Sequence, residues 1–387
     1  MEMLILHQLS ENKAKKYKEF CMFNKDIKIK NTLGMFDLYK GVIMVSILLS
    51  HCYGIFDNRD VFMTIAVVIF SLVGTACLPA LFIMSGYGFR KTTFKKCVRH
   101  QFKSIMIPYC ITVVLTCIVH LIAYFELYGG GVKSTIKETI KLALGSLLGL
   151  SDSLAIFGYE IPANRVAWFL VALFVGSVVF NQFLNYFEGE KLFAACVIAS
   201  IIGWIISKGP TTPWCISQGL VATLYMCIGY FAKKKKYFIA DISKKISISV
   251  TLICALVFLA TLALGAEFNM ALSYYPYGPV YIFLMALVAV ANIYWFLRLN
   301  RAKGLITTSL RSIGRNSLYV LLIHNIELTA VGVYLQYDFV NNWQGPVWLR
   351  NLIVIGVRFI VVFGLTYIFV WAKSNIFSKV RFGNSSR

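Results

Sequence analysis

Three ionisable side chains lie in stretches that are otherwise apolar, and together they could transfer protons. His51 lies deep in FDLYKGVIMVSILLSHCY, and His324 and Glu327 lie in IGRNSLYVLLIHNIELT. An imidazole changes charge near neutral pH, and a carboxylate beside it orients it as a general base. Ionisable groups inside apolar segments are costly, so their default interpretation is functional. A structural clamp, with His324 bonded to Asn325 or Asn316, is the alternative.

The spacing of these residues defines helix faces. Lys40 and His51 are eleven residues apart, which is about three helical turns, so both lie on one face about 16 Å apart. His324 and Glu327 are three residues apart and also share a face. Glu327 has three candidate arrangements: it pairs with Arg358, bonds His324 on its own helix, or faces an aqueous vestibule. For Lys40, simple anchoring at a membrane surface is the alternative to a functional role.

The composition places these residues in a membrane. The chain has 387 residues, of which 58% are hydrophobic and only 14% charged. These fractions exclude an ordinary soluble protein and predict an all-α, polytopic bundle of membrane-spanning helices. The ten cysteines form no CxxC pair, so they predict neither a disulfide framework nor a metal site. About ten apolar segments are long enough to cross a bilayer, at 37–56, 62–89, 104–125, 166–187, 192–207, 215–232, 246–265, 278–298, 316–336 and 351–372.

The distribution of charge predicts the topology. The formal net charge is +21, and the lysines and arginines crowd alternate loops, so topology explains the charge without a nucleic-acid partner. Those loops are then cytoplasmic, as are both termini of a multi-pass protein in the plasma membrane. We expect a basic tail at 1–36, a membrane domain at 37–372 and a C-terminal tail at 373–387. The outer connection 126–165 contains an amphipathic helical pattern, which is either a lid over an acceptor site or a connector.

Five motifs in order resemble those of the acyltransferase 3 family, which are integral membrane proteins. The first is Asp37, Lys40, Gly41 and His51, where Lys40 stands in place of the family's arginine. A lysine keeps the charge but loses the bidentate fork for phosphate. The later motifs are Phe82, Ser85, Gly86 and Tyr87; then Arg99, Lys103 and Pro108; then Trp168 to Leu170; and finally Gly314, Ser317, Tyr319, Leu322 and His324.

The resemblance implies acyl transfer from cytoplasmic acyl-CoA to a hydroxyl group. CoA is polyanionic, so basic residues on the inner face are expected to hold its phosphates. The donor-binding candidates are Lys40, Asp37, Ser85, Arg90, Arg99 and Lys103. The catalytic candidates are His51, Glu327 and His324, with His51 deprotonating the acceptor hydroxyl or assisting passage of the acyl group. Positive-inside topology is the alternative explanation for the basic loop.

We therefore predict a membrane O-acyltransferase that moves an acetyl group from acetyl-CoA to a hydroxyl of a cell-surface or secreted glycan. Its expected partners are the acyl-CoA donor, the glycan acceptor and the lipid bilayer, without a metal; the sequence does not define an oligomeric state. A transporter or flippase for a glycan or lipid-linked intermediate is the second hypothesis, because it too would place polar residues in a central cavity. Cleavage of the thioester distinguishes the two.

Overall fold

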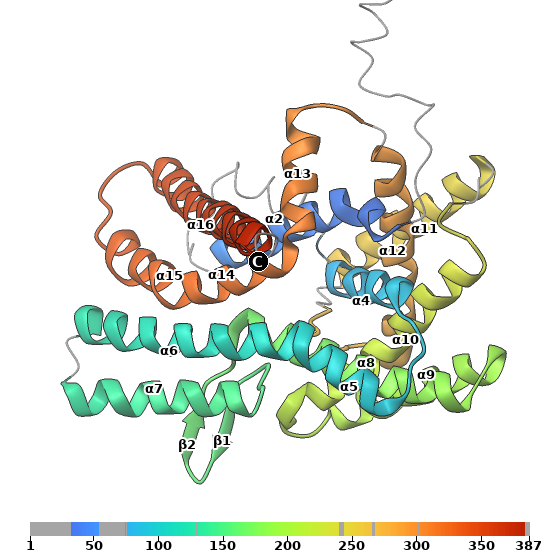
Figure 1. The fold of residues 1–387 in the computed structure, drawn as a ribbon, viewed down its shortest axis with the longest axis horizontal. Coiled ribbons are helices and arrows are strands. Elements are labelled where there is room, and N and C mark those ends of the chain that lie inside the picture. The colour runs from blue at the N-terminus through green and yellow to red at the C-terminus, as the bar shows by residue number, and fades with distance from the viewer. Residues whose placement is uncertain are drawn as a thin grey trace, which may run out of the picture.

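A computed structural model describes residues 32–53, 74, 76–128, 131–239, 244–264, 268–300 and 302–383. In these ranges the chain is a bundle of helices with a single two-stranded antiparallel hairpin (Figure 1). A helix satisfies its backbone hydrogen bonds internally, which the hydrocarbon core of a bilayer requires. The predicted all-α membrane fold is confirmed.

The first part of the bundle leads from α2 to the hairpin. Its elements are η1 (Leu33–Phe36), α2 (Asp37–Tyr53), α4 (Cys77–Gly88), α5 (Phe94–Gln101), η2 (Phe102–Met106), α6 (Ile107–Tyr128), α7 (Val132–Leu147), β1 (Leu154–Ile156) and β2 (Tyr159–Ile161). The helices η2 and η5 are π-helical. The second part contains η3 (Arg165–Ala167), α8 (Trp168–Tyr186), α9 (Gly189–Ile206), η4 (Pro213–Cys215), α10 (Ile216–Lys234), α11 (Lys244–Ala263), α12 (Gly278–Leu299), α13 (Leu305–Arg315), α14 (Ser317–Thr329), α15 (Val331–Tyr334), η5 (Leu335–Val340) and α16 (Val347–Gly383).

Seven of the described helices are long and apolar enough to cross a membrane. An eighth candidate is the pair 317–329 and 331–340, which is bent by 44°. Two shorter apolar helices, at 77–88 and 247–261, coincide with two further predicted segments. Each predicted segment therefore contains a helix, while the number that cross the bilayer stays a prediction. Residues 1–31 and 62–73, which hold most of the basic tail and the start of the second segment, lie outside the described residues.

Glycines bring α2 and α13 into direct backbone contact. A Cβ atom built on Gly41 would lie 1.9 Å from the carbonyl oxygen of Leu310, and one built on Gly314 would lie 1.8 Å from that of Asp37. No side chain fits at such distances, so only glycine permits this crossing, as is common between membrane helices. Both glycines belong to the sequence motifs described above, and their packing places Arg315 beside Asp37.

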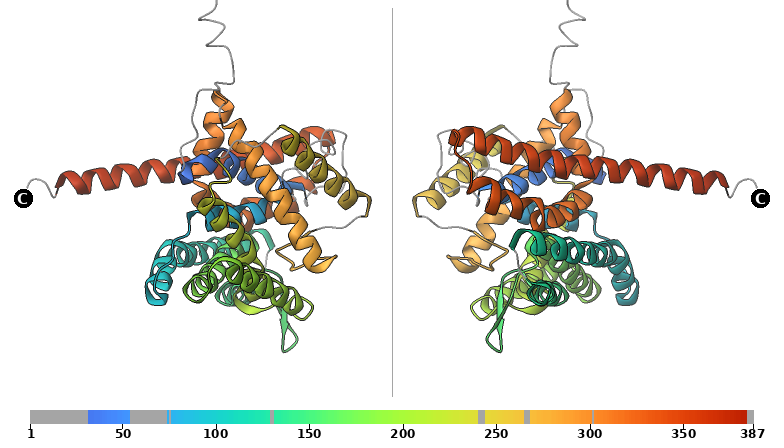
Figure 2. Two further views of the ribbon diagram at one scale, coloured as in Figure 1. Left: turned by 90° about the vertical axis from the view of Figure 1, so that its right-hand side faces the viewer. Right: turned by 90° about the vertical axis from the view of Figure 1, so that its left-hand side faces the viewer.

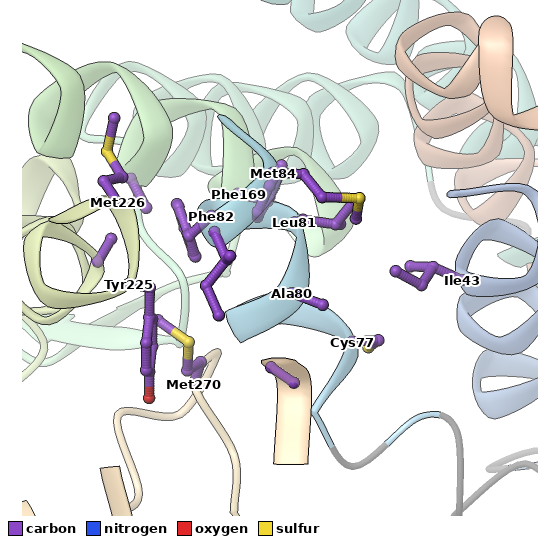
Figure 3. Close-up of a cluster of buried hydrophobic side chains, with 14 of the residues drawn as sticks. Ile43, Cys77, Ala80, Leu81, Phe82, Met84, Phe169, Tyr225, Met226 and Met270 are labelled. Atoms are coloured by element: carbon purple, nitrogen blue, oxygen red, sulfur yellow. The ribbon is translucent and has the colours of Figure 1, made fainter. Parts of the chain in front are cut away.

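Glycines also bring α4 and α10 into direct backbone contact. A Cβ atom on Gly86 would lie 2.0 Å from the carbonyl oxygen of Met226, and one on Gly229 would lie 1.9 Å from that of Ile83. Around this crossing α4 is almost entirely buried, and its Phe82 packs against Phe169 of α8 with ring centroids 4.9 Å apart (Figure 3). The core thus fixes α4 and α8 relative to each other.

The amphipathic pattern after Gly131 forms α7, which lies side by side with α6 (Figure 1). Thr139 Oγ1 lies 2.8 Å from His120 Nδ1 on α6, and the hydroxyl of Tyr109 donates to the backbone oxygen of Ser146. His120 therefore has a structural partner. The location of α7 on the outer side of the membrane stays a prediction.

The last helix, α16, runs without a break from Val347 to Gly383 and projects from the body of the protein (Figure 2). The predicted end of the membrane domain at residue 372 lies inside this helix. The side chain of Lys373, just past that point, donates to the hydroxyl of Tyr319 on α14. The domain boundaries at 36 and 372 stay predictions.

The predicted topology can be tested by labelling single cysteines. Lys235 is exposed just after α10, and Lys141 belongs to α7. In a background without the native cysteines, a membrane-impermeant maleimide applied to intact cells should modify a cysteine at 141 but not at 235. The exposed Lys133 provides a second outer position. Equal labelling of all three positions, or labelling of 235 alone, would contradict the alternating topology.

Candidate functional site

Four ionisable side chains from three helices meet at the end of α2. His51 lies in its last turn, His324 and Glu327 lie on α14, and Arg358 lies on α16. The ring centroids of His51 and His324 are 5.2 Å apart. The Nδ1 atom of His324 lies 3.0 Å from Glu327 Oε2. The structure thus brings the three predicted catalytic residues together.

Arg358 holds this cluster together. Its Nε donates to Glu327 Oε1 at 2.7 Å and its Nη2 donates to Glu327 Oε2 at 3.1 Å, which is the bidentate geometry of an arginine–carboxylate pair. Its Nη1 donates to the backbone oxygen of His51 at 3.0 Å. The fully buried guanidinium therefore fixes both Glu327 and the turn that carries His51.

Glu327 accordingly adopts two of its three predicted arrangements at once, with Arg358 and with His324. Its connection to His51 is indirect, through the guanidinium and the ring of His324. Among the residues that the structure describes, none hydrogen-bonds a ring nitrogen of His51. Glu327 directly contacts the second imidazole, that of His324.

The carboxylate sets the tautomer of His324. An ionised Glu327 accepts a hydrogen bond, so the proton of the neutral imidazole lies on Nδ1, and Nε2 carries a lone pair. His324 Nε2 is buried without a hydrogen-bond partner in the described part of the chain. Buried polar atoms usually have partners. An unpartnered basic nitrogen beside a second imidazole is the arrangement of a proton-transfer site.

The two imidazoles differ in access. His324 is 2% exposed, whereas His51 is exposed. This difference separates an exposed imidazole from an inner one that is hydrogen-bonded to a carboxylate.

Asn325 places α14 against two other helices. Its Oδ1 accepts from the backbone N–H of Ala167 at 3.1 Å, and its Nδ2 donates to Thr116 Oγ1 at 3.3 Å. Asn316 donates to the backbone oxygen of Ser312 at 2.9 Å. The clamp considered from the sequence, with His324 bonded to one of these asparagines, is not the contact that forms, because His324 bonds Glu327.

A cavity of about 220 Å³ lies between α2, α4, α8 and α14. Two predicted donor-binding residues, Lys40 and Ser85, line it together with Ser317, and its remaining walls are apolar. Lys40 Nζ is held 2.8 Å from Asp37 Oδ1, whose other oxygen lies 3.8 Å from Arg315 Nε. The cavity combines one cation with apolar walls and is lined by residues from four of the five sequence motifs.

Two helices lead from this cavity to the imidazoles. On α2, His51 lies eleven residues beyond Lys40, or about 16 Å along the axis. On α14, His324 lies seven residues beyond Ser317, or about 10 Å along the axis. Lys40 and Ser317 line the same cavity. Further along the same two helices, the imidazoles of His51 and His324 lie in contact. The helices therefore run in the same sense from the cation to the imidazole pair.

The predicted basic loop lies elsewhere. Arg90, Arg99 and Lys103 are exposed and do not line the cavity. The loop after α4 is fixed at Thr92, whose N–H donates to Asn181 Oδ1 at 3.0 Å and whose oxygen accepts from Asn185 Nδ2 at 3.1 Å. This segment is anchored on α8. Among the described residues, Arg90, Arg99 and Lys103 form no salt bridge with an acidic side chain.

A family model described as an acyltransferase domain matches residues 34–371, which is nearly the whole chain. The chain belongs to the acyltransferase 3 family. No curated protein and no solved structure gives a match. Membership in this family establishes a membrane acyltransferase, which gives the imidazole cluster and the cavity a chemical context. Within the described ranges, no group of three or more His, Cys, Asp or Glu could hold a metal ion.

From the sequence, Arg358 is a possible partner of Glu327 but is not one of the predicted site residues. Its contact with the backbone of His51 has no sequence signature. The signal that could have identified it is an arginine in the middle of the apolar stretch NLIVIGVRFIVVFG. Such a residue is costly in a membrane unless it is paired, so it identifies a polar cluster before any contact is known.

Proposed function

We propose that this acyltransferase moves an acetyl group from cytoplasmic acetyl-CoA to a hydroxyl of a cell-surface or secreted glycan at the plasma membrane. The observation that supports it is the cavity with Lys40 at one end and the two helices that lead from it to His51 and His324. A cation suits the anionic end of the donor, and apolar walls suit its thin acyl-bearing arm. Family membership favours acyl transfer over transport without chemistry.

In this proposal Lys40 contacts a phosphate of CoA. Asp37 holds the ammonium group of Lys40, and Ser85 lines the same cavity. The exposed Arg90, Arg99 and Lys103 remain predicted phosphate contacts outside the cavity. The acetyl thioester is then directed along α2 toward the imidazole pair.

The chemical step places His51 at the acceptor. The acceptor oxygen attacks the thioester carbonyl carbon while a ring nitrogen of His51 takes the hydroxyl proton. The carbon–sulfur bond then breaks, and the departing thiolate receives that proton. His324, held by Glu327, presents its Nε2 lone pair to the protonated His51 and stabilises the charge that forms.

The function can be tested by following the thioester. Purified protein in nanodiscs, given acetyl-CoA, should release free CoA thiol only when a glycan acceptor is added. Glycans from cells that lack the gene should have lost acetyl groups relative to those of the parent cells. Acetyl-CoA that stays intact while the glycan still crosses the membrane would instead support a transporter.

Lys40 provides the test of donor binding. Loss of a charge-assisted contact weakens binding by about 1.5–3 kcal/mol, or roughly one to two decades. We expect Lys40→Met to raise KM for acetyl-CoA by that factor with a smaller effect on kcat, and Lys40→Arg to preserve the wild-type KM. The matched control is Arg315→Met, because Arg315 also lies near Asp37 but is 75% exposed. An unchanged KM in Lys40→Met would remove Lys40 from the donor site.

A further inference from the structure

The helix α7 presents its apolar face away from the protein. The face packed inward carries mostly small or polar residues, with Thr135, Thr139, Leu142, Gly145 and Ser146 buried. The opposite face carries exposed isoleucines and leucines (Ile136, Ile140, Leu144 and Leu147). Small residues allow α7 to approach α6 closely. In the described part of the chain, only the hairpin β1–β2 lies opposite this apolar face.

This face forms one wall of a groove. The hairpin β1–β2 forms the other wall, and the groove has a volume of about 500 Å³. Three lysines on α7, at 133, 137 and 141, line it together with the apolar side chains. Lys141 lies 2.7 Å from Glu138, and Lys137 lies 5.6 Å from the centre of the Tyr159 ring. Lys133 is exposed. The groove therefore combines an apolar floor with a cationic rim.

The tip of the hairpin carries a nearly fully exposed aromatic ring. Phe157 is 97% exposed, and its backbone has a φ of 49°. The next residue, Gly158, has a φ of 78°, so both central turn positions are left-handed. Hairpins with this turn favour Asn–Gly, and a bulky residue in the first position is unfavourable. No described contact within the protein compensates, which suggests that the ring serves a contact outside the protein.

We propose that this groove binds an anionic phospholipid of the surrounding bilayer. The acyl chain would lie along Ile136, Ile140 and Leu144, and the phosphate would contact Lys133 and Lys137. Phe157 would anchor the hairpin at the headgroup level, where aromatic rings are favoured. Lysines near an anionic headgroup add affinity, whereas apolar walls alone do not distinguish one lipid from another.

The position of the groove separates it from the acyl-transfer site. On α7 the groove is lined by the exposed Ile136, Ile140 and Leu144, whereas the buried Thr139 contacts His120 of α6. The helix α6 in turn contacts α14 through Thr116 and Asn325. Two helices therefore stand between the groove and His324, so a bound lipid is not the acyl acceptor. This inference does not depend on the proposed function.

The proposal is tested by native mass spectrometry of the full-length protein released from micelles that contain equal amounts of phosphatidylglycerol and phosphatidylcholine. Wild-type protein should retain phosphatidylglycerol preferentially. Each lysine near an anionic headgroup contributes about fivefold, so Lys133→Gln with Lys137→Gln should reduce the preference about 25-fold. The matched control is Lys191→Gln with Lys208→Gln, which removes the same charge from the start of α9 and from just beyond its end.

The variant Phe157→Asn distinguishes a loss of lipid binding from a loss of folding stability. Asparagine suits the turn, so this variant should unfold at an equal or higher temperature than wild type while retaining less lipid. Equal retention of phosphatidylglycerol by the Lys133/Lys137 variant would overturn the proposal, as would equal retention of the two lipids by wild type. A loss of the same size in the α9 control would also overturn it, because general surface charge would then explain the preference.

Discussion

Replacement of His51 by glutamine is expected to abolish acetyl transfer while the protein still inserts in the membrane and binds acetyl-CoA. Glutamine keeps hydrogen-bonding capacity but takes no proton at neutral pH. General base catalysis contributes about 10² to 10⁴ in rate, so kcat should fall by that factor. Because His51 is exposed and no described residue hydrogen-bonds its ring, the substitution breaks no observed side-chain hydrogen bond. The measurement is kcat and KM for acetyl-CoA in nanodiscs.

His120 supplies the control for this prediction. Its imidazole lies on α6 and bonds Thr139, away from the cluster on α2 and α14. His120→Gln should keep wild-type turnover. If His51→Gln retains most activity, proton transfer at His51 is wrong, and the residue keeps only a structural role. If both variants lose activity equally, the effect reflects disturbance of the bundle and not chemistry.

Helical periodicity was sufficient to assign faces, and this is why the site residues could be found in the sequence. Lys40 and His51 are eleven positions apart, and His324 and Glu327 are three positions apart. These spacings place each pair on one side of a helix whatever the helix packs against. From the sequence, Gly41 and Gly314 could be recognised only as members of motifs. Glycine is needed at these positions because the backbones of α2 and α13 are in contact, and these two segments are far apart in sequence.

Contacts between helices were beyond sequence reasoning. Periodicity left three arrangements open for Glu327, and two of them form together because Arg358 reaches across from α16. The predicted donor-binding residues fall into two groups, inside and outside the cavity, for the same reason. Lys40 and Ser85 meet in one cavity, while Arg99 and Lys103 lie on a helical extension that only tertiary packing could place. A helix was predicted for each apolar segment, but the pairs of helices that touch were not.

The amphipathic pattern of α7 shows a second limit. The period predicted a helix with an apolar side, and apolar sides usually face a core. Here the buried side carries two threonines, a glycine and a serine beside a single leucine, Leu142. The small residues let two helices approach closely. In a membrane protein the lipid accepts the apolar face, so hydrophobicity alone does not indicate which side of a helix packs inward.

The Glu327–Arg358 pair is expected to affect rate and stability separately. Glu327→Gln alone leaves a buried arginine without its counter-ion, which costs about 3–5 kcal/mol of stability. Adding Arg358→Gln removes the unpaired charge, so the double variant should recover much of the thermal stability of the wild type. It should not recover kcat, because His324 still lacks the carboxylate that orients it. Recovery of both stability and turnover would indicate a purely structural pair.

The coupling of Glu327 to His51 is tested by a double-mutant cycle. Residues that act as one catalytic unit are strongly non-additive. If His51, His324 and Glu327 form a single proton-transfer unit, kcat of His51→Gln combined with Glu327→Gln should be scarcely lower than that of the slower single variant. His324→Gln in place of Glu327→Gln should behave in the same way. Loss factors that multiply would show that Glu327 acts independently of His51, and its pairing with Arg358 would then be the better account of its role.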